Sequence, residues 1–145
     1  MIKYVYFDVG GVVIRDFSRT KKWVELKNEL GVTLENNSTF EQIWNSCKQT
    51  RDTTFDVDAL VPQLRKDINP NIPEDYSLLI GFVSRFEKNE EIRPVISEIE
   101  KAVPVGLLTN MYPRMFDSIH AAGIMPQVDW KVIIDSSVVK LKKPE

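Results

Sequence analysis

Three sites in this 145-residue sequence place reactive or phosphate-binding side chains directly after short apolar runs. Ligands of open parallel α/β sheets bind beyond the carboxyl ends of the strands, so groups far apart in the sequence can share one cleft there. We therefore expect the side chains at these sites to meet in one cleft. They are Asp8, after residues 2–7; Thr109-Asn110, after residues 103–108; and Lys143, which follows the run ending at Asp135.

Asp8 is followed by Val9, Gly10 and Gly11, a sequence typical of a tight turn. Glycines let the backbone approach a ligand closely, and successive amides in such a turn can bind an anion. A carboxylate beside a bound phosphate would repel it unless a cation intervenes or the carboxylate attacks phosphorus. The pattern thus suggests a nucleophilic aspartate working with Mg²⁺. The alternative reading, an ordinary turn at a strand end, stays open on spacing alone.

Between and after these sites, the apolar pattern predicts strand, block of helices, strand, helix, strand. Short apolar strands separated by helices indicate a parallel sheet covered by helices. Helices are expected to begin near Ser18, Asn37, Asp56 and Pro73, and another to cover residues 92–102. Four helices are too many for one crossover, so they predict an inserted helical subdomain. After the second strand, Pro113 is expected to start a helix that Gly123 ends.

Composition excludes several classes of function. Lysine plus arginine number 19 and aspartate plus glutamate 21, a formal net charge of −2. This balance argues against nucleic-acid binding by phosphate neutralisation. Cys47 and His120 are the only residues of their types, which excludes an internal disulfide and a cysteine-rich or multi-histidine metal site. No apolar run could span a membrane and no signal-peptide pattern is present, so we expect a cytoplasmic protein without membrane or nucleic-acid partners.

The three sites together resemble the motifs of the haloacid dehalogenase (HAD) superfamily. Tyr6-Phe7-Asp8-Val9-Gly10-Gly11-Val12-Val13 resembles its first motif, Leu107-Leu108-Thr109-Asn110 its second, and Lys143-Pro144-Glu145 its third. Ile92-Arg93-Pro94 resembles the sugar-phosphate phosphatase branch, which includes glucose-1-phosphate phosphatases. The resemblance implies a three-layer α/β Rossmann-like core over residues 1–16 and 90–145. Residues 17–89 would form the small helical cap of the C1 type.

The resemblance also implies a role for each matching residue. Asp8 would attack phosphorus to form an aspartyl-phosphate and would bind Mg²⁺, with the backbone carbonyl of Gly10 as a second ligand. Thr109 would donate its hydroxyl to the phosphate, Asn110 would orient it, and Lys143 would neutralise the charges of the carboxylate and the phosphoryl group. These roles suit phosphoryl transfer, which depends on positioning and charge stabilisation. The implied phosphate-binding residues are Val9, Gly10, Gly11, Thr109, Asn110 and Lys143.

The sequence departs from the family in two places. Most of its phosphatases carry a second aspartate two residues after the nucleophile, as general acid and base, but Gly10 stands there. The family's fourth motif, an acidic pair that supplies a further Mg²⁺ ligand, has no counterpart, because two residues follow Lys143. We therefore expect a core truncated at its C-terminus, with residues 2–7 at a sheet edge. We also expect weak magnesium binding, low activity and self-association through this first strand.

The leading hypothesis is a magnesium-dependent phosphatase acting on a small phosphorylated metabolite, such as a sugar phosphate. One alternative is a dehalogenase, which also lacks the second aspartate; the other is a non-catalytic binding protein with this fold. For several side chains a structural role is favoured over a functional one. Trp23 and Trp44 are expected in the core of the cap, His120 in a structural helix, and Arg15 and Asp16 in a solvated hinge. Lys140 and Lys142 are expected in a solvated tail.

Overall fold

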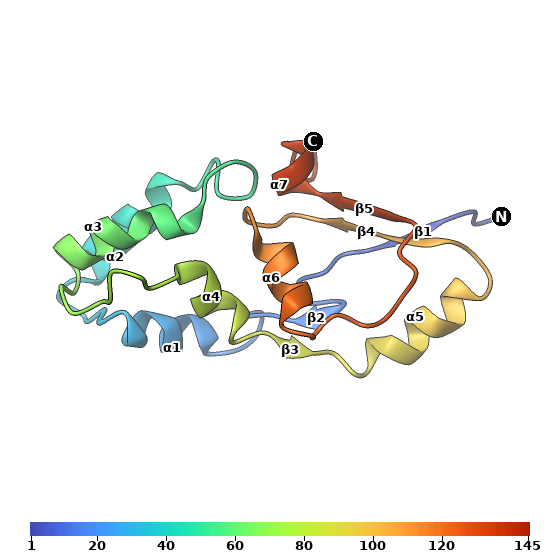
Figure 1. Ribbon diagram of the computed structural model, residues 1–145, viewed down its shortest axis with the longest axis horizontal. Coiled ribbons are helices and arrows are strands. Elements are labelled where there is room, and N and C mark those ends of the chain that lie inside the picture. The colour runs from blue at the N-terminus through green and yellow to red at the C-terminus, as the bar shows by residue number, and fades with distance from the viewer.

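The computed structural model describes residues 1–145 as an α/β protein with one parallel sheet and a group of helices beside it (Figure 1). The three strands of the parallel sheet lie in the order β1-β4-β5. The helices α1–α4 gather at one end of the elongated molecule, and the sheet with α5 and α6 occupies the other. No helix is long and apolar enough to cross a lipid bilayer. The elements are β1 (Val5–Phe7), β2 (Ile14–Arg15), α1 (Lys22–Glu29), α2 (Asn37–Ser46), the 3₁₀ helix η1 (Val57–Leu60), α3 (Val61–Asp67), α4 (Leu78–Val83), β3 (Glu87–Lys88), α5 (Ile92–Glu100), β4 (Val105–Thr109), α6 (Met115–Ala121), β5 (Val132–Asp135) and α7 (Ser136–Val139).

The register of the sheet aligns the ends of its strands. Phe7 of β1 lies opposite Leu107 of β4, and Thr109 of β4 lies opposite Asp135 of β5. Because all pairs are parallel, the residues that follow β1, β4 and β5 lie along the same edge of the sheet. The predicted strands, their order in the chain and the parallel sheet are confirmed. β1 has a neighbour on one side only, so it forms an edge of the sheet, as expected.

A second, two-stranded sheet joins the two ends of the predicted insert, and the sequence did not indicate it. β2 pairs antiparallel with β3, with Ile14 opposite Lys88 and Arg15 opposite Glu87. Each strand has only two residues, too few for a periodic pattern to be recognised in the sequence. The pair brings the chain out of the insert beside the point where it entered. The predicted boundaries, 1–16 and 90–145 for the core and 17–89 for the cap, stay a prediction.

Four helices lie within the predicted insert, as expected, but α4 does not begin at Pro73. Residues 73–76 form a turn instead, in which the Tyr76 N–H donates to the Pro73 carbonyl at 3.1 Å. The side chain of Ser77 accepts a hydrogen bond from the Ile80 N–H, so Ser77 caps the helix and α4 begins at Leu78. Likewise, the helix expected from Pro113 begins at Met115, because Arg114 adopts a left-handed backbone conformation (φ 68°).

One hydrophobic cluster connects the helical end to the sheet. It contains Leu26 of α1 and Phe40 of α2 together with Leu107 of β4 and Ile119 of α6, all nearly inaccessible to solvent. Cys47 lies in the same cluster, and burial raises the pKa of its thiol. The aromatic side chains of the insert pack closely, with the Trp23 and Trp44 ring centroids 5.3 Å apart. Because the cluster contains residues of both parts, burial of apolar surface holds the helical end in place against the sheet.

Candidate active site

The side chains of Asp8 and Lys143 form an ion pair at the carboxyl edge of the sheet. The Lys143 Nζ donates to the Asp8 Oδ2 at 2.8 Å and to the Leu108 carbonyl at 3.0 Å. The Val9 N–H donates to the other carboxylate oxygen of Asp8 at 2.8 Å. The side chains of Lys143 and Asp8 are 34% and 43% exposed, so this carboxylate is open to a ligand while its charge is partly balanced. The first and third sites of the sequence therefore meet, across 135 positions.

Thr109 and Asn110, which complete the predicted constellation, lie at the end of β4, the strand between β1 and β5. Thr109 is 2% exposed, and its hydroxyl oxygen has no hydrogen-bond partner. Buried hydroxyls are nearly always paired, so the Thr109 hydroxyl is free to bond to a ligand or to a water molecule. Both groups of the Asn110 amide face the backbone of Lys143: its Oδ1 accepts from the Lys143 N–H at 2.9 Å, and its Nδ2 donates to the Lys143 carbonyl at 3.4 Å. In this geometry Asn110 positions Lys143.

The turn after Asp8 is tight, and a side chain at residue 10 would crowd the carboxylate of Asp16. A Cβ on Gly10 would come within 2.9 Å of the Asp16 Oδ2, and Gly11 has a φ of +74°. The Asp16 Oδ1 accepts a hydrogen bond from the Ser18 N–H at 2.8 Å, which holds this carboxylate in place. Asp16 was expected in a solvated hinge. It is half-buried and lies beside residue 10, the position at which the resembled family carries its second aspartate.

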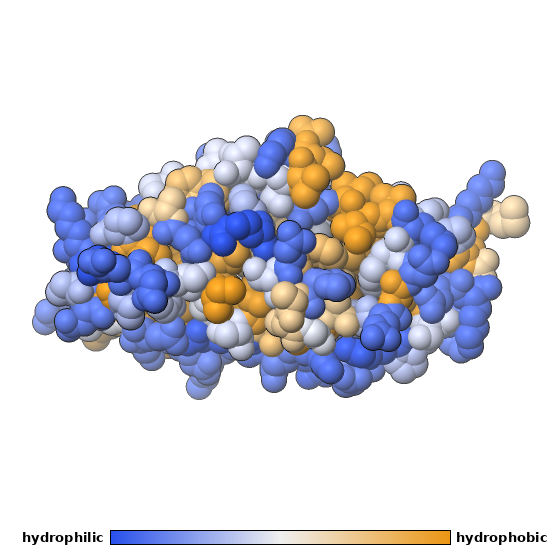
Figure 2. Space-filling model, in the orientation of Figure 1, coloured by the Kyte–Doolittle hydropathy of each residue, from blue (hydrophilic) through white to orange (hydrophobic).

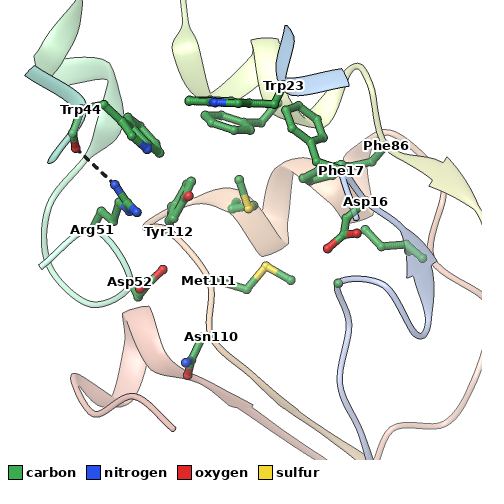
Figure 3. Close-up of a pocket in the computed structure, with 14 residues that line it drawn as sticks. Asp16, Phe17, Trp23, Trp44, Arg51, Asp52, Phe86, Asn110, Met111 and Tyr112 are labelled. Atoms are coloured by element: carbon green, nitrogen blue, oxygen red, sulfur yellow. Dashed lines mark hydrogen bonds between the residues drawn. The ribbon is translucent and has the colours of Figure 1, made fainter. Parts of the chain in front are cut away.

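Next to this turn, a cavity of about 380 Å³ separates the helical end from the sheet (Figure 3). We call it the aromatic cavity. In Figure 3 the rings of Trp23, Trp44, Phe17 and Phe86 lie along one side, and Asn110 and Asp52 lie on the other. The fourteen residues that line it are Gly10, Ile14, Asp16, Phe17, Trp23, Trp44, Arg51, Asp52, Phe82, Phe86, Asn110, Met111, Tyr112 and Met115. Trp23 and Trp44 thus belong to the packed interior, as expected, and also face the cavity.

The C-terminal segment holds the loop that carries Arg51 and Asp52. The Ser136 hydroxyl donates to the Asp52 carbonyl. The Lys140 Nζ donates to the Thr53 carbonyl, and the Lys142 Nζ donates to the Gln49 carbonyl, both at 3.2 Å. Lys140 and Lys142 are therefore not a free tail: they tie the loop of the helical end to the segment that carries Lys143.

A second tie between the two ends of the molecule is made by Arg114, just before α6. Its Nε donates to the Asp56 Oδ2 at 2.8 Å, and its Nη2 donates to the Asp56 Oδ1 at 2.7 Å and the Asp58 Oδ2 at 2.8 Å. These hydrogen bonds hold the pKa of Asp56 below its usual value and raise the pKa of Arg114. Asp58 in turn accepts from the Leu79 N–H at the start of α4. The network links the start of α6 to η1 and α4.

The oxygen atoms beside the turn fit a magnesium ion only in part. Mg²⁺ in phosphoryl-transfer sites is typically held by one or two carboxylates, the substrate phosphate and water. Asp8 offers one half-exposed carboxylate and Gly10 a backbone carbonyl, while the unpaired Thr109 hydroxyl offers a contact to phosphate. No group of three or more His, Cys, Asp or Glu side chains is arranged to hold a metal. The residues present therefore suit an ion that the substrate helps to hold.

The remaining polar residues singled out in the sequence lie apart from this site. His120 lies on α6 and Arg93 on α5, and neither lines the aromatic cavity. Sequence reasoning missed Arg51 and Asp52, which the insert brings to the site, and Tyr112, which lies in the loop after β4. Burial raises the pKa of Tyr112 to about 12. Only the position of Tyr112, three residues after Thr109, placed it near the site in advance.

Comparisons with known proteins match this chain through its structure alone. No family model and no curated protein matches the sequence. A HAD family enzyme from Bacteroides thetaiotaomicron superposes with a TM-score of 0.74 at 16% identity, over 99% of this chain and 73% of that one. The wild-type form of that enzyme in complex with magnesium and inorganic phosphate gives a TM-score of 0.73 at 15% identity, over 100% and 74% of the two chains. An L-2-haloacid dehalogenase from Xanthobacter autotrophicus, with chloropropionic acid covalently bound, gives 0.55 at 15% identity, over 100% and 61%.

Proposed function

We propose that this chain, which has the HAD fold, is a magnesium-dependent phosphatase acting on a small phosphorylated metabolite. The contact that supports this most directly is the 2.8 Å hydrogen bond between the Lys143 Nζ and the Asp8 Oδ2, at a strand edge where the Thr109 hydroxyl has no partner. A nucleophilic carboxylate, a cation beside it and a free hydroxyl donor are what transfer of a phosphoryl group requires. Sugar phosphates are the first substrates to test, because of the sequence resemblance.

In the proposed reaction an Asp8 carboxylate oxygen attacks phosphorus, the bond from phosphorus to the alcohol oxygen breaks, and an aspartyl-phosphate forms. Lys143 balances the negative charge of the attacked phosphoryl group, and Thr109 donates its hydroxyl to a phosphate oxygen. Water then attacks the aspartyl-phosphate, releasing inorganic phosphate and restoring Asp8. Mg²⁺, held by the Asp8 carboxylate, the Gly10 carbonyl and the substrate, would neutralise phosphate charge when bound.

Turnover should be slow, because residue 10 has no side chain to exchange protons with the leaving alcohol. General acid–base catalysis is typically worth about 10²–10⁴-fold in rate. The leaving oxygen must therefore take its proton from water or from another group. Few carboxylates are present to hold a metal ion, so we expect weak magnesium binding when no substrate is present. Titration calorimetry should give a dissociation constant in the millimolar range or above.

The test is phosphate release by the purified chain from a panel of phosphomonoesters, with and without magnesium. We expect release that requires the ion and disappears in Asp8→Asn, while the circular dichroism spectrum stays unchanged. Arg93→Gln serves as the control, because Arg93 lies on α5 away from the site. A folded chain that releases no phosphate from any ester, even at high enzyme concentration, would overturn the proposal and favour a binding protein.

A second candidate is hydrolytic dehalogenation, favoured by the apolar lining of the aromatic cavity and by the missing carboxylate at residue 10. In that reaction Asp8 would attack carbon, and the halide would leave without needing a proton. A metal-independent release of halide from 2-haloacids, lost in Asp8→Asn, would identify it.

We also propose that the free edge of β1 lets two chains associate. Backbone groups on this edge have no strand partner, and Tyr6 is 46% exposed there. Unpaired edges readily pair with another chain.

A further inference from the structure

The aromatic cavity is lined by Gly10 and Asn110, two residues of the proposed phosphate site, so it adjoins the place where an ester attacked by Asp8 would bind. We propose that this cavity receives the leaving group, and that the preferred leaving group is an uncharged alcohol carrying an apolar ring. The inference rests on the proposed phosphatase function and narrows its substrate class. It sets ring-bearing esters ahead of the sugar phosphates suggested by the resemblance.

The size and lining of the cavity fit one ring. Its volume of about 380 Å³ lies at the lower end of the range typical for pockets that bind small molecules. Nine of the fourteen lining residues are hydrophobic, so a buried ring would exchange water contacts for aromatic and thioether contacts. Figure 2 shows that the surface of the helical end is mostly hydrophilic, in contrast to the mainly hydrophobic lining of the cavity.

The aromatic side chains of the cavity hold one another in place. Trp23 and Phe82 are stacked, with centroids 5.8 Å apart and ring planes 19° apart. Phe82 also lies 5.1 Å from Phe17 and 5.6 Å, edge to face, from Tyr112. Rings that already pack on one another lose little conformational entropy when a ligand binds, so binding is not weakened by the cost of ordering these side chains.

The polar groups of the cavity are poorly suited to a polyhydroxylated leaving group. Both groups of the Asn110 amide are engaged by the backbone of Lys143. The Arg51 guanidinium stacks on the Trp44 ring, 4.3 Å from its centroid, and its Nη1 donates to the Trp44 carbonyl at 3.2 Å. Hydroxyls buried without partners cost binding energy, and a sugar would bring several of them into this site.

Charge also restricts the leaving group. The cavity carries two carboxylates, Asp16 and Asp52, and one cation, Arg51, which already stacks on Trp44. An anionic leaving group would face both carboxylates. The Ser136 hydroxyl, bonded to the Asp52 carbonyl, fixes the loop that carries two of these charges, so they cannot readily move away. A neutral ring meets neither difficulty.

The experiment compares three phosphomonoesters of primary alcohols, so that the intrinsic reactivity of the leaving group is similar: benzyl phosphate, 4-carboxybenzyl phosphate and glucose 6-phosphate. We expect kcat/KM for benzyl phosphate to exceed that of each of the others by about tenfold or more, the scale at which an apolar pocket discriminates. Equal or faster hydrolysis of glucose 6-phosphate would overturn the inference and leave the phosphatase function standing.

Matched variants test whether the cavity carries this preference. Phe86→Leu removes a ring from the cavity wall, whereas Phe116→Leu makes the same change on α6 outside the cavity. We expect Phe86→Leu to lower the ratio of benzyl phosphate to glucose 6-phosphate hydrolysis several-fold and Phe116→Leu to leave that ratio unchanged. If both variants change the ratio equally, the preference does not come from the cavity and the inference is wrong.

A binding measurement separates failure of the inference from failure of the proposed function. Trp23 and Trp44 line the cavity, so their fluorescence reports occupancy. In Asp8→Asn, the concentration of benzyl phosphate that changes this fluorescence should be at least tenfold lower than the concentration of glucose 6-phosphate that does so. If the wild-type chain hydrolyses no ester and this difference is still found, the phosphatase function falls and the ring preference stands. If benzyl phosphate changes the fluorescence only at the concentration at which glucose 6-phosphate does, or above it, the ring preference is wrong.

Discussion

Replacing Arg114 by glutamine should weaken the connection between the helical end of the molecule and its sheet. The Arg114 guanidinium donates to both Asp56 oxygens, at 2.7 and 2.8 Å, and to the Asp58 Oδ2 at 2.8 Å. These partners lie 58 and 56 positions away in the sequence, in a different part of the fold. The shorter glutamine amide could replace one of these hydrogen bonds but neither the charge nor the forked geometry.

The expected loss of stability is modest, because solvent screens the pairs. The Arg114 side chain is 52% exposed and that of Asp56 is 42% exposed. Exposed pairs contribute about 0.2–1 kcal/mol each, and the bidentate contact with a second carboxylate places this network at the upper end. We therefore expect Arg114→Gln to lower the free energy of unfolding by about 1 kcal/mol and the melting temperature by roughly 3 °C.

The effect should depend on pH in one direction. The hydrogen bond from Arg114 holds the pKa of Asp56 below its usual value of about 3.9. A depressed carboxyl pKa stabilises the fold at pH values above the pKa in the unfolded chain, and this contribution is lost as pH falls through the pKa in the folded chain. The difference between wild type and Arg114→Gln should therefore be constant from about pH 5 to 7 and should shrink below about pH 4.

Urea denaturation at several pH values measures these differences. Asp56→Asn is the partner variant, because asparagine can still cap η1 while losing the charge. A double-mutant cycle between the two changes should give a coupling of about 1 kcal/mol, against a few tenths for the exposed Lys101–Glu98 pair used as a control. A coupling no larger than that of the control pair, or a difference that persists unchanged at about pH 3, would refute this reasoning.

Four further predictions concern the site and the sheet edge. Lys143→Met should lower kcat about 10²–10³-fold with little change in stability, because it removes one donor from the reacting group; steady-state kinetics on any accepted ester measures it. Gly10→Ala should destabilise the chain by roughly 1 kcal/mol, since the new Cβ would lie 2.9 Å from the Asp16 Oδ2, and Asp16→Ala should remove that penalty; urea denaturation of the single and double variants decides. Tyr112, with a pKa raised to about 12 by burial, should stay neutral in the folded chain while the unfolded chain ionises near pH 10; stability is then full below pH 10 and falls as pH rises towards 12, and Tyr112→Phe should weaken this decline in alkaline denaturation. Self-association through the free edge of β1 should appear in sedimentation at high concentration and weaken in Tyr6→Lys; a monomer at all concentrations would exclude it.

The positions of the reacting groups could be predicted from the sequence because they depend on local patterns. Asp8 and Thr109 each follow a short apolar run, and buried parallel strands have this appearance. Their carboxyl ends share one edge whatever the intervening segments do, so the meeting of Asp8 with Lys143 could be expected without knowing the insert. The end of the helix before Gly123 could be predicted in the same way, because glycine readily adopts the left-handed conformation found there (φ 72°).

Helix starts were less predictable, because several residues compete to begin a helix. Pro73 with acidic residues after it is a common helix start, yet Ser77 caps α4 and Asp58, from a distant segment, accepts from the Leu79 N–H. The left-handed conformation of Arg114 likewise goes with ion pairs to Asp56 and Asp58. In both cases contacts with a distant part of the chain accompany the local choice, and no sequence pattern near the helix contains them.

The sequence by itself determined which groups are candidates for the chemistry: a carboxylate, a hydroxyl and a lysine at strand ends, with glycine at residue 10. Only the tertiary structure decided what surrounds them. The aromatic cavity and the docking of Lys140 and Lys142 on the loop of Arg51 both arise where the insert packs against the sheet. The physical reason is that strand ends follow from backbone hydrogen bonding and local burial, whereas the space between two packed bodies depends on side chains contributed by many distant segments at once.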